Sequence, residues 1–289
     1  MPAQIIDGNL LASAIRSELH ERVANLRASG RPVKLVAVLA SSAPAGEIYA
    51  QRQGATCREI GIDYSLEKLP ANSTFEKLAA EVDRLNRDPN VTGIMLHLPL
   101  PAGIEPTRLQ HIIAVEKDVE GVSPANIGYV VYGQQQIAPC TALAAIRLVE
   151  STGYRVEGAE ACVVGASAIA GRPAAMLLTQ MGATVTICHK LTRDLKSHTR
   201  RADILIVAAG VPNLIAADHV REGAVVIDVG INRVTTLDGT TKTIGDVNFE
   251  DVKDKAAYLS PVPGGVGPMT VAMLLLNTVR AAEKLGSVA

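Results

Sequence analysis

The chain has 289 residues, of which 48% are hydrophobic and 20% are charged, and its formal net charge is −1. These values are typical of a globular protein long enough for two domains, and the near-zero charge gives no basis for binding nucleic acid or an anionic membrane surface. Four scattered cysteines without a Cys-x-x-Cys pair argue against a zinc centre or a disulfide framework. Without a signal-peptide pattern or a long apolar run, we expect a cytoplasmic protein that contains no metal.

The first half of the chain alternates between helical and strand patterns. Apolar residues recur at helical spacing over 9–28, and a buried strand follows at 33–41. Ser73 and Glu76 form a capping-box pattern at the start of an amphipathic helix. The remaining expected elements are a helix at 46–60, a strand at 62–70, a helix at 73–86 and a strand at 91–101. Strands that alternate with helices predict a parallel sheet covered by helices, which is an α/β fold.

A second series of strands and helices begins near residue 140. The pattern predicts helices at 142–151 and 171–182 and strands at 161–165, 184–189, 203–210 and 223–230. The glycine- and proline-bearing stretches around 121–140 and 261–268 are the expected linkers.

The stretch "VVGASAIAGRP" joins a strand of the second series to a helix. Gly165 allows a tight turn and close approach to a phosphate, and Gly171 allows the helix to pack closely on the strand. The free N–H groups at the helix start then suit a pyrophosphate. The spacing is G-x-x-x-x-x-G rather than G-x-G-x-x-G, so a purely structural turn is the alternative.

Cationic residues surround this turn where a site for NAD usually has an acidic residue. The next strand ends in His189 and Lys190, and Arg172 follows the glycine turn. Positive charge in both places suits the 2′-phosphate of NADP. The alternative is that these residues are ordinary cations on an exposed loop.

The stretch "SPVPGGVGPMTVAML" (260–274) places three prolines and three glycines before a helix. Such a loop can bring backbone amides close to a planar ligand, although a plain turn would have a similar composition. It stands in order with other stretches of the chain: "IIDG" (5–8), "GIMLHLPLP" (93–101), "KDVEG" (117–121), "PCT" (139–141), "GASAIAGRP" (165–173), "VIDVGIN" (226–232) and "GDV" (245–247). With these motifs in register, the chain resembles the bifunctional methylenetetrahydrofolate dehydrogenase/methenyltetrahydrofolate cyclohydrolase family over essentially its whole length.

The resemblance implies an N-terminal α/β folate domain at 1–139, completed by a C-terminal helix within 268–289. It also implies a Rossmann-type NADP-binding domain at 140–267, a folate cleft at the junction and a homodimer formed through the cofactor domains. The folate contacts would come from Tyr49, Leu98, Pro99, Pro263, Gly264 and Gly265. The NADP contacts would come from Thr141, Gly165, Ala166, Ser167, Gly171, Arg172, Pro173, His189, Lys190, Ala209, Gly210, Asp228, Gly230, Ile231 and Thr270.

The stretch "GEIYAQRQGATC" (46–57) departs from the family pattern. Tyr49 and Gln53 are separated by four positions, so they share one face of the expected helix. The family has a lysine at Gln53, which is the main polar group of the cyclohydrolase reaction. It also has a glutamine at His97, an aspartate at Glu120 and a serine at Gly46. We therefore expect Tyr49, Gln53, His97 and Glu120 to line one altered catalytic cleft.

These departures bear on one of the two family reactions. Cyclohydrolysis needs a group that exchanges protons near neutral pH, and a glutamine amide cannot do so. His97 can titrate in that range, although it can equally serve only as a hydrogen-bonding side chain. Hydride transfer mainly requires two ligands held in contact, so we expect it to survive. Glu120 keeps the charge of the family's aspartate but is longer by one methylene group, which can displace the pterin.

Three functional hypotheses remain open at this level. The first is an NADP-dependent methylenetetrahydrofolate dehydrogenase whose cyclohydrolase activity is weak or lost. The second is a family member whose altered cleft serves another folate derivative or another small substrate. The third is a non-catalytic binding protein, and the intact motifs at Arg172, Asp228 and Thr270 weigh against it.

Overall fold

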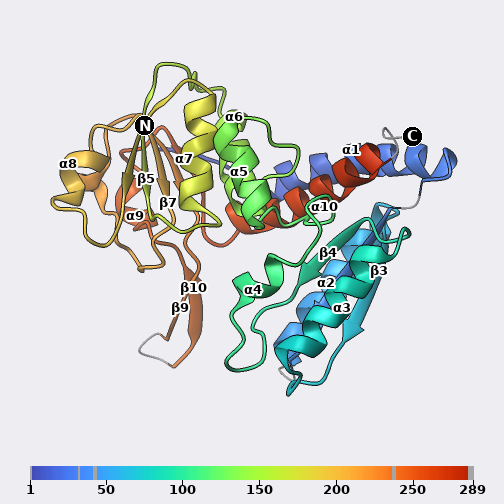
Figure 1. Ribbon diagram of the computed structural model, residues 1–289. Helices are drawn as coiled ribbons and strands as arrows, with labels where there is room; N and C mark the ends of the chain where they lie inside the picture. The colour runs from blue at the N-terminus through green and yellow to red at the C-terminus, as the bar shows by residue number, and fades with distance from the viewer. Residues whose placement is uncertain (1, 32, 42–43, 236–238, 286–289) are drawn as a thin grey trace. The chain divides into compact units, whose positions relative to one another are not determined.

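The computed structural model describes residues 2–31, 33–41, 44–235 and 239–285 (Figure 1). The chain divides into two compact units. The large-sheet unit contains Met1–Ser13 and Pro139–Met273, and the small-sheet unit contains Ala14–Ala138 and Leu274–Ala289. Residues 1, 32, 42–43 and 286–289 of the expected folate domain, and 236–238 of the expected cofactor domain, lie outside the described residues.

The small-sheet unit is built on a three-stranded parallel sheet in the order β3-β2-β4. Its strands are β2 (Lys34–Leu39), β3 (Asp63–Lys68) and β4 (Gly93–Leu96), and its main helices are α2 (Pro44–Glu59) and α3 (Phe75–Arg87). Two short helices follow, α4 (Pro106–Gln110) and α5 (Pro124–Tyr132). The alternating strands and helices therefore form the expected parallel α/β layer.

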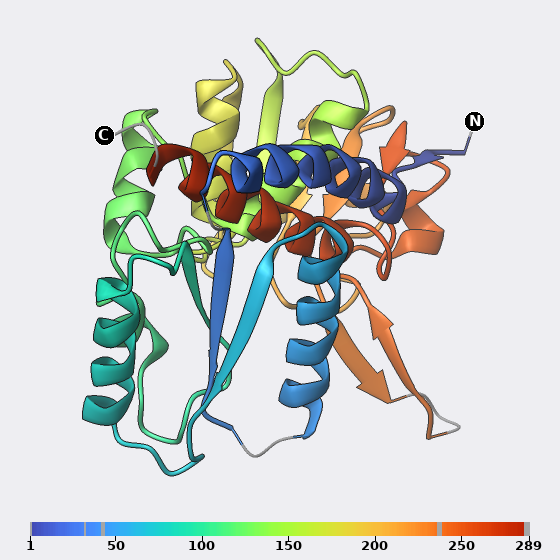
Figure 2. The ribbon, with the colours of Figure 1, turned by 90° about the vertical axis from the view of Figure 1, so that its right-hand side faces the viewer.

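The two main helices cover opposite faces of this sheet (Figure 2). The buried side chains Leu78, Val82 and Leu85 of α3 pack against Val36, Val38, Ile94 and Leu96. The alternate positions face α2. Leu35 pairs with Tyr64 and Ala37 pairs with Met95, so these four side chains share one face because strand side chains alternate. The register thus places Tyr64 and Met95 beneath α2.

Two long helices contribute to the small-sheet unit from distant parts of the chain. They are α1 (Gly8–Ala28) and α10 (Val266–Leu285), which lie side by side in Figures 1 and 2. Arg22 of α1 forms an ion pair with Glu283 of α10 at 2.8 Å. The buried Asn277 of α10 donates hydrogen bonds to the carbonyl oxygens of Val119 and Ala138, both at 2.9 Å. These contacts confirm the expected return of the C-terminal helix.

The large-sheet unit has six parallel strands in the order β1-β11-β8-β7-β5-β6. The strands are β1 (Gln4–Ile5), β5 (Glu160–Val164), β6 (Thr184–Cys188), β7 (Ile204–Val207), β8 (Val225–Asp228) and β11 (Tyr258–Leu259). The helices are α6 (Cys140–Ser151), α7 (Gly171–Gln180), α8 (Leu195–Thr199), α9 (Phe249–Val252) and a 3-10 turn at Ala217–His219. An antiparallel hairpin of β9 (Asn232–Thr235) and β10 (Thr241–Ile244) extends from the sheet. This arrangement confirms the Rossmann-type expectation.

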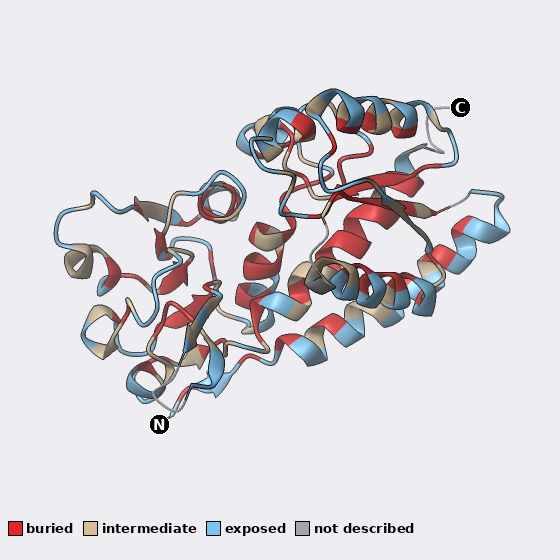
Figure 3. Ribbon diagram, turned by 90° about the horizontal axis from the view of Figure 1, so that it is seen from below, coloured by how far each residue is buried: buried red, intermediate tan, exposed pale blue. Residues whose placement is uncertain are grey.

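Buried apolar residues follow the strands and the inner faces of the helices (Figure 3). The central strands of the large sheet are buried along most of their length, and all four residues of β7 and of β8 are buried. Parallel strands covered on both faces show such continuous apolar runs, because neither face meets water.

Three local features differ from the sequence expectations. The first thirteen residues belong to the large-sheet unit, because β1 pairs with β11 and the amide of Gly8 donates to the carbonyl oxygen of Gly264 at 2.9 Å. The expected linker at 121–140 contains α5, which Ser123 caps through its hydroxyl. The helix expected to begin with Ser73 is capped instead by Thr74, whose hydroxyl accepts from the amide of Lys77 at 3.4 Å.

Candidate active site and cofactor site

A cavity of about 590 Å³ opens at the carboxyl ends of β5 and β7 in the large-sheet unit. The chain runs from β5 to its neighbour β6 and then crosses back to β7 on the other side of β5, so the connections diverge at this edge. Ligands of parallel α/β sheets bind at such switch points. The cavity is lined by Val164, Gly165, Ala166, Ser167, Arg172, His189, Lys190, Leu191, Thr192, Leu195, Ala208, Ala209, Val211 and Leu214. Seven expected cofactor residues therefore lie around one hollow.

The floor of this strand-end cavity depends on two glycines. Gly165 has a φ of +113°, and a Cβ atom there would lie 2.1 Å from the carbonyl oxygen of Ala208. A Cβ atom on Gly171 would lie 1.8 Å from the carbonyl oxygen of Gly165. Any side chain would force these backbone segments apart. The hydroxyl of Ser167 accepts from the amide of Gly171 at 3.3 Å, which orders the turn into α7.

The expected cationic residues stand at the rim of the same cavity. Arg172, His189 and Lys190 are exposed and line it together. The Nδ1 atom of His189 accepts from the amide of Leu191 at 3.1 Å, and the hydroxyl of Thr192 accepts from the amide of His189 at 2.9 Å. These bonds hold the loop after β6 in a defined turn, so its side chains are presented by an ordered backbone.

Asp228 and Asp246 organise the neighbouring strand ends. The carboxylate of Asp228 accepts from the amides of Gly230, Asp246 and Val247 at 2.9–3.0 Å. One oxygen of Asp246 accepts from the amides of Ala209 and Gly210 at 2.6 and 2.8 Å. Burial raises the pKa of Asp228 to about 6 in spite of its amide donors. We did not identify Asp246 as a site residue from the sequence, although it is the central residue of the "GDV" motif.

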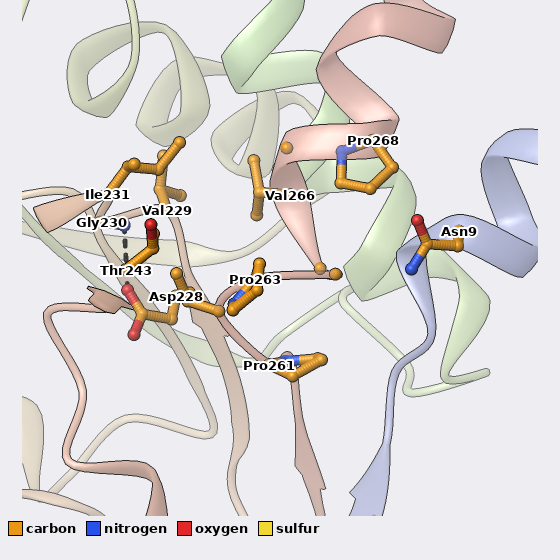
Figure 4. A pocket seen from close by; sticks show the side chains of 14 residues that line it. Asn9, Asp228, Val229, Gly230, Ile231, Thr243, Pro261, Pro263, Val266 and Pro268 are labelled. Atoms are coloured by element: carbon orange, nitrogen blue, oxygen red, sulfur yellow. Dashed lines mark hydrogen bonds between the residues drawn. The ribbon is translucent and has the colours of Figure 1, made fainter. Parts of the chain in front are cut away.

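A second cavity, of about 340 Å³, lies at the proline- and glycine-rich loop before α10 (Figure 4). Its lining includes the expected substrate residues Pro263, Gly264 and Gly265, but also Asp228, Gly230 and Ile231, which were expected to bind cofactor. The loop has a cis bond between Val262 and Pro263, and Gly264 has a φ of +108°. The amide of Gly265 donates to the carbonyl oxygen of Pro261 at 2.9 Å, so the loop is closed on itself.

Five expected cofactor residues line neither of these cavities, and one of them is Gly171, which packs against the carbonyl oxygen of Gly165. The hydroxyl of Thr270 donates to the carbonyl oxygen of Val266 within α10 at 3.1 Å. Pro173 is buried in the first turn of α7, and Thr141 is half-buried in the first turn of α6. Gly210 contributes its amide to Asp246. Thr270 and Gly210 thus take part in hydrogen bonds within the large-sheet unit.

In the small-sheet unit, the four expected catalytic residues gather at the carboxyl end of β4. Tyr49 on α2 is 49% exposed and meets the ring of His97 edge to face, with ring centroids 5.8 Å apart. Gln53 and His97 are buried. Glu120 accepts from the amide of Leu96 at 3.4 Å, which brings its carboxylate next to the same strand end. Leu98 and Pro99 are exposed directly after His97, and a cis bond joins them.

Hydrogen bonds tie the buried members of this cluster together through a residue that we did not identify from the sequence. The Tyr64 hydroxyl lies 3.3 Å from Oε1 of Gln53 and 3.4 Å from Nε2 of His97. Nε2 of Gln53 donates to the sulfur of Met95 at 3.1 Å. Gly54 is the sequence feature that could have indicated this contact. A glycine inside a helix lowers helix stability, so its presence suggests that another group approaches the helix backbone closely. A Cβ atom on Gly54 would lie 2.7 Å from the Tyr64 ring.

Burial changes the acid–base properties of the cluster. It lowers the pKa of His97, raises that of Tyr64 above its usual value, and raises that of Glu120 to about 7. The buried Asp118 adds to the shift of Glu120 through like-charge repulsion. Near neutral pH, therefore, His97 is neutral, Tyr64 is a phenol and Glu120 exchanges a proton.

The rest of the "KDVEG" motif is structural. The ammonium group of Lys117 donates to the carbonyl oxygens of Leu85, Asn86 and Asp88 at 2.7–3.0 Å, which satisfies the end of α3. Asp118 accepts from the amide of Ser123 at 2.7 Å and orders the loop into α5. Lys117 and Asp118 thus anchor the segment that leads into Glu120.

Within residues 2–31, 33–41, 44–235 and 239–285, His, Cys, Asp and Glu side chains form no group of three or more suited to a metal ion. In the same residues, none of the helices has the length and apolar character needed to cross a membrane.

Comparison with known proteins covers both halves of the chain. Residues 6–120 match the model of the tetrahydrofolate dehydrogenase/cyclohydrolase catalytic domain, and residues 139–285 match that of the NAD(P)-binding domain of the same family. The bifunctional protein FolD of Moorella thermoacetica is 48% identical over 98% of this chain and 100% of its own.

Solved structures are similar over the same extent. The bifunctional enzyme FolD from Campylobacter jejuni is 42% identical, covers 98% of this chain and 99% of its own, and has a TM-score of 0.93. The Trypanosoma brucei dehydrogenase-cyclohydrolase, solved with NADP and an inhibitor, is 37% identical and has a TM-score of 0.91. The match covers 100% of this chain and 99% of that structure's chain. The chain therefore belongs to the tetrahydrofolate dehydrogenase/cyclohydrolase family.

Proposed function

We propose that this protein oxidises methylenetetrahydrofolate to methenyltetrahydrofolate with NADP, and that it hydrolyses the methenyl product poorly. The observation that carries the proposal is the strand-end cavity, where Arg172, His189 and Lys190 stand together at the rim. Family membership supplies the substrate class. Both the Moorella thermoacetica and the Campylobacter jejuni relatives are described as bifunctional.

The strand-end cavity fits a dinucleotide phosphate. The backbone near Gly165 and Gly171 lies where Cβ atoms would fill the turn, so a pyrophosphate can approach the start of α7. Arg172 and Lys190 would neutralise a 2′-phosphate, with His189 beside them. Asp246 would keep the strand-end amides of Ala209 and Gly210 in place. When NADP is bound, its nicotinamide ring supplies the hydride acceptor.

At the proposed folate site, side chains of the protein would orient the substrate. Tyr49 offers an exposed aromatic face, and Leu98 with Pro99 offers exposed apolar surface beside it. Glu120, with a pKa of about 7, can donate to or accept from a polar edge of the pterin. Pro263, Gly264 and Gly265 are proposed as further contacts. Hydride transfer needs these groups for placement, because the folate nitrogens stabilise the cation that forms.

Gln53 is the basis for expecting weak cyclohydrolase activity. Its amide is buried, accepts from Tyr64 and donates to Met95, so it cannot take up or release a proton. Losing one acid–base group typically lowers a rate by about a hundred- to ten-thousand-fold. His97 is the neighbouring group that could replace it, but burial lowers its pKa and makes its neutral ring a weaker proton acceptor.

Two assays with the purified protein test the proposal. One follows NADPH formation from NADP and methylenetetrahydrofolate, and the other follows the decay of methenyl absorbance against a buffer blank. We expect rapid NADPH formation and near-spontaneous methenyl decay. Enzymatic methenyl decay that His97→Ala abolishes would show that the histidine performs the hydrolysis. Absence of both activities would favour another folate derivative or small substrate.

A thermal-shift titration with NADP, NAD and tetrahydrofolate separates these outcomes from a non-catalytic binding protein. A ligand that binds the native state raises the melting temperature, and it does so more at higher affinity and higher concentration. We expect the largest rise with NADP. Stabilisation by ligands in a protein that is inactive on every folate substrate would identify a binding protein.

We also propose that the protein is a homodimer formed through its large-sheet unit. The family resemblance supports this assembly. Sedimentation equilibrium should give twice the mass of the chain, and a monomer at micromolar concentration would refute it.

A further inference from the structure

We propose that Tyr64 is a positioning residue that holds His97 in its Nε2–H tautomer, so that Nδ1 is the nitrogen with which His97 accepts a hydrogen bond. The proposal rests on the proposed function only in assigning this cluster to the folate site. Its starting point is the Tyr64 hydroxyl, which lies 3.3 Å from Oε1 of Gln53 and 3.4 Å from Nε2 of His97.

The orientation of Gln53 decides which way the protons point. Its Nε2 donates to the sulfur of Met95 at 3.1 Å, and its Oε1 faces Tyr64. A flipped amide would place a carbonyl oxygen against a sulfur that has no proton to donate. Gln53 is only 4% exposed, so water could not satisfy the displaced oxygen. The amide is therefore fixed with its oxygen toward the phenol.

The phenol then determines the histidine tautomer. Tyr64 has one hydroxyl proton, and the Gln53 oxygen can only accept, so that proton goes to Gln53. The Tyr64 oxygen can therefore only accept a hydrogen bond from His97, so Nε2 of His97 must carry the proton and donate it. A neutral imidazole carries one N–H, so Nδ1 holds the ring's lone pair. Burial keeps Tyr64 protonated and His97 neutral, which preserves this arrangement.

The fold fixes Tyr64 independently of these bonds. Its pairing with Leu35 turns the ring toward α2, and Gly54 on α2 leaves room for it. A Cβ atom at position 54 would lie 2.7 and 2.9 Å from two ring carbons. The ring therefore cannot coexist unchanged with a larger residue there. Gly54 and Tyr64 form a matched pair, one supplying space and the other the hydroxyl.

This geometry makes His97 a hydrogen-bond acceptor toward a bound ligand. His97 accepts from a bound N–H or O–H group, as the ring amide and amino groups of a pterin provide, rather than donating to a carbonyl oxygen. The distances of 3.3 and 3.4 Å are long for such bonds, and catalytic hydrogen bonds often shorten when a ligand binds. The hydrogen-bonded series runs from the buried Met95 and Gln53 through the half-buried Tyr64 to His97, against which the exposed Tyr49 packs.

The test is the imidazole nitrogen spectrum of the ¹⁵N-labelled full chain, since long-range ¹H–¹⁵N correlations distinguish the two neutral tautomers. His97→Gln identifies the His97 signals among the six histidines. We expect the unaltered protein to show the Nε2–H form. Tyr64→Phe, which removes only the hydroxyl, should lower the ratio of Nε2–H to Nδ1–H by about fivefold, the effect of one hydrogen bond. It should also lower kcat for methylenetetrahydrofolate without changing the KM for NADP.

Two further variants sharpen the result. Gly54→Ala keeps the hydroxyl but displaces the ring, and it should change the tautomer ratio in the same direction. Tyr132→Phe, at a position that is 82% exposed, is the matched control and should change neither the spectrum nor kcat. An Nδ1–H form in the unaltered protein, or an unchanged ratio in Tyr64→Phe, would overturn the proposal. The spectrum needs no turnover, so failure of the proposed dehydrogenase activity would be seen separately.

Discussion

Tyr49 meets His97 edge to face, with ring centroids 5.8 Å apart and ring planes at 87°. The histidine is 3% exposed and the tyrosine is 49% exposed, so the contact links a buried polar group to the surface of the small-sheet unit. An aromatic pair of this geometry contributes about 0.5–1.5 kcal/mol beyond the area it buries. The pair combines a residue that the family pattern shares with one that departs from it.

Restoring the family lysine alone should recover little cyclohydrolase activity. Gln53→Lys would place an ammonium group in a buried position beside Met95 and Tyr64, where desolvation opposes its charge. The triple change Gln53→Lys, His97→Gln, Glu120→Asp should recover far more. Methenyl absorbance decay measures both. Equal recovery in the single and triple variants would show that His97 and Glu120 do not limit the reaction.

Arg172→Ala should weaken NADP binding by about 1–3 kcal/mol, the scale of lost charge-assisted hydrogen bonds. Binding of NAD should stay nearly unchanged, because NAD lacks the 2′-phosphate. Isothermal titration with both cofactors measures the difference. Arg155→Ala, which removes an exposed arginine paired with Glu157, is the matched control. An equal loss for both cofactors would mean that Arg172 does not contact the 2′-phosphate.

Glu120 should make the protein less stable as the pH rises. Burial raises its pKa to about 7 in the folded protein from an ordinary value of 4.5, so the native state keeps this proton to higher pH than the unfolded chain. The stabilisation is complete below about pH 4.5 and is lost as the pH rises through about 7. Glu120→Gln cannot titrate and should lose this part of the pH dependence.

Urea unfolding at pH 5 and pH 8 tests this shift. The stability of the unaltered protein relative to Glu120→Gln should fall by an amount on the order of 2 kcal/mol between the two conditions. Glu222→Gln, at an exposed turn, is the control for removing one carboxylate. A constant difference between the unaltered protein and Glu120→Gln would show that the carboxyl is not perturbed by burial.

Gly165→Ala should be severely destabilising. The added methyl group would lie 2.1 Å from the Ala208 carbonyl oxygen, and φ at this position is +113°. We expect a loss of roughly 3–5 kcal/mol in the free energy of unfolding together with loss of NADP binding. Gly223→Ala is the matched control, because it has a φ of +79° and open space around it.

The control should lose only about 1–2 kcal/mol, the cost of a left-handed conformation. Denaturant unfolding and NADP titration check both variants. Equal losses for Gly165→Ala and Gly223→Ala would attribute the effect to backbone conformation rather than to the close contact.

Much of the fold could be predicted from local patterns. The apolar runs of β5, β7 and β8 and the helical spacing of α1 and α3 depend on residues close in sequence, so periodicity reveals them. The role of Gly165 and Gly171 could also be predicted from the sequence, because a strand–turn–helix in which backbone segments approach closely leaves few alternatives to glycine. The cluster of Tyr49, Gln53, His97 and Glu120 followed from the family resemblance rather than from periodicity.

Other features depend on partners far away in the chain. β1 is a two-residue strand whose identity comes only from pairing with β11, and Asp246 acquires its role from the amides of Ala209 and Gly210. Tyr64 is an ordinary strand residue until the register turns it toward α2 and Gly54 leaves room for its ring. Packing and burial decide which groups form hydrogen bonds between such distant parts of the chain. Neither leaves a periodic pattern in the sequence, so these contacts could not be predicted from it.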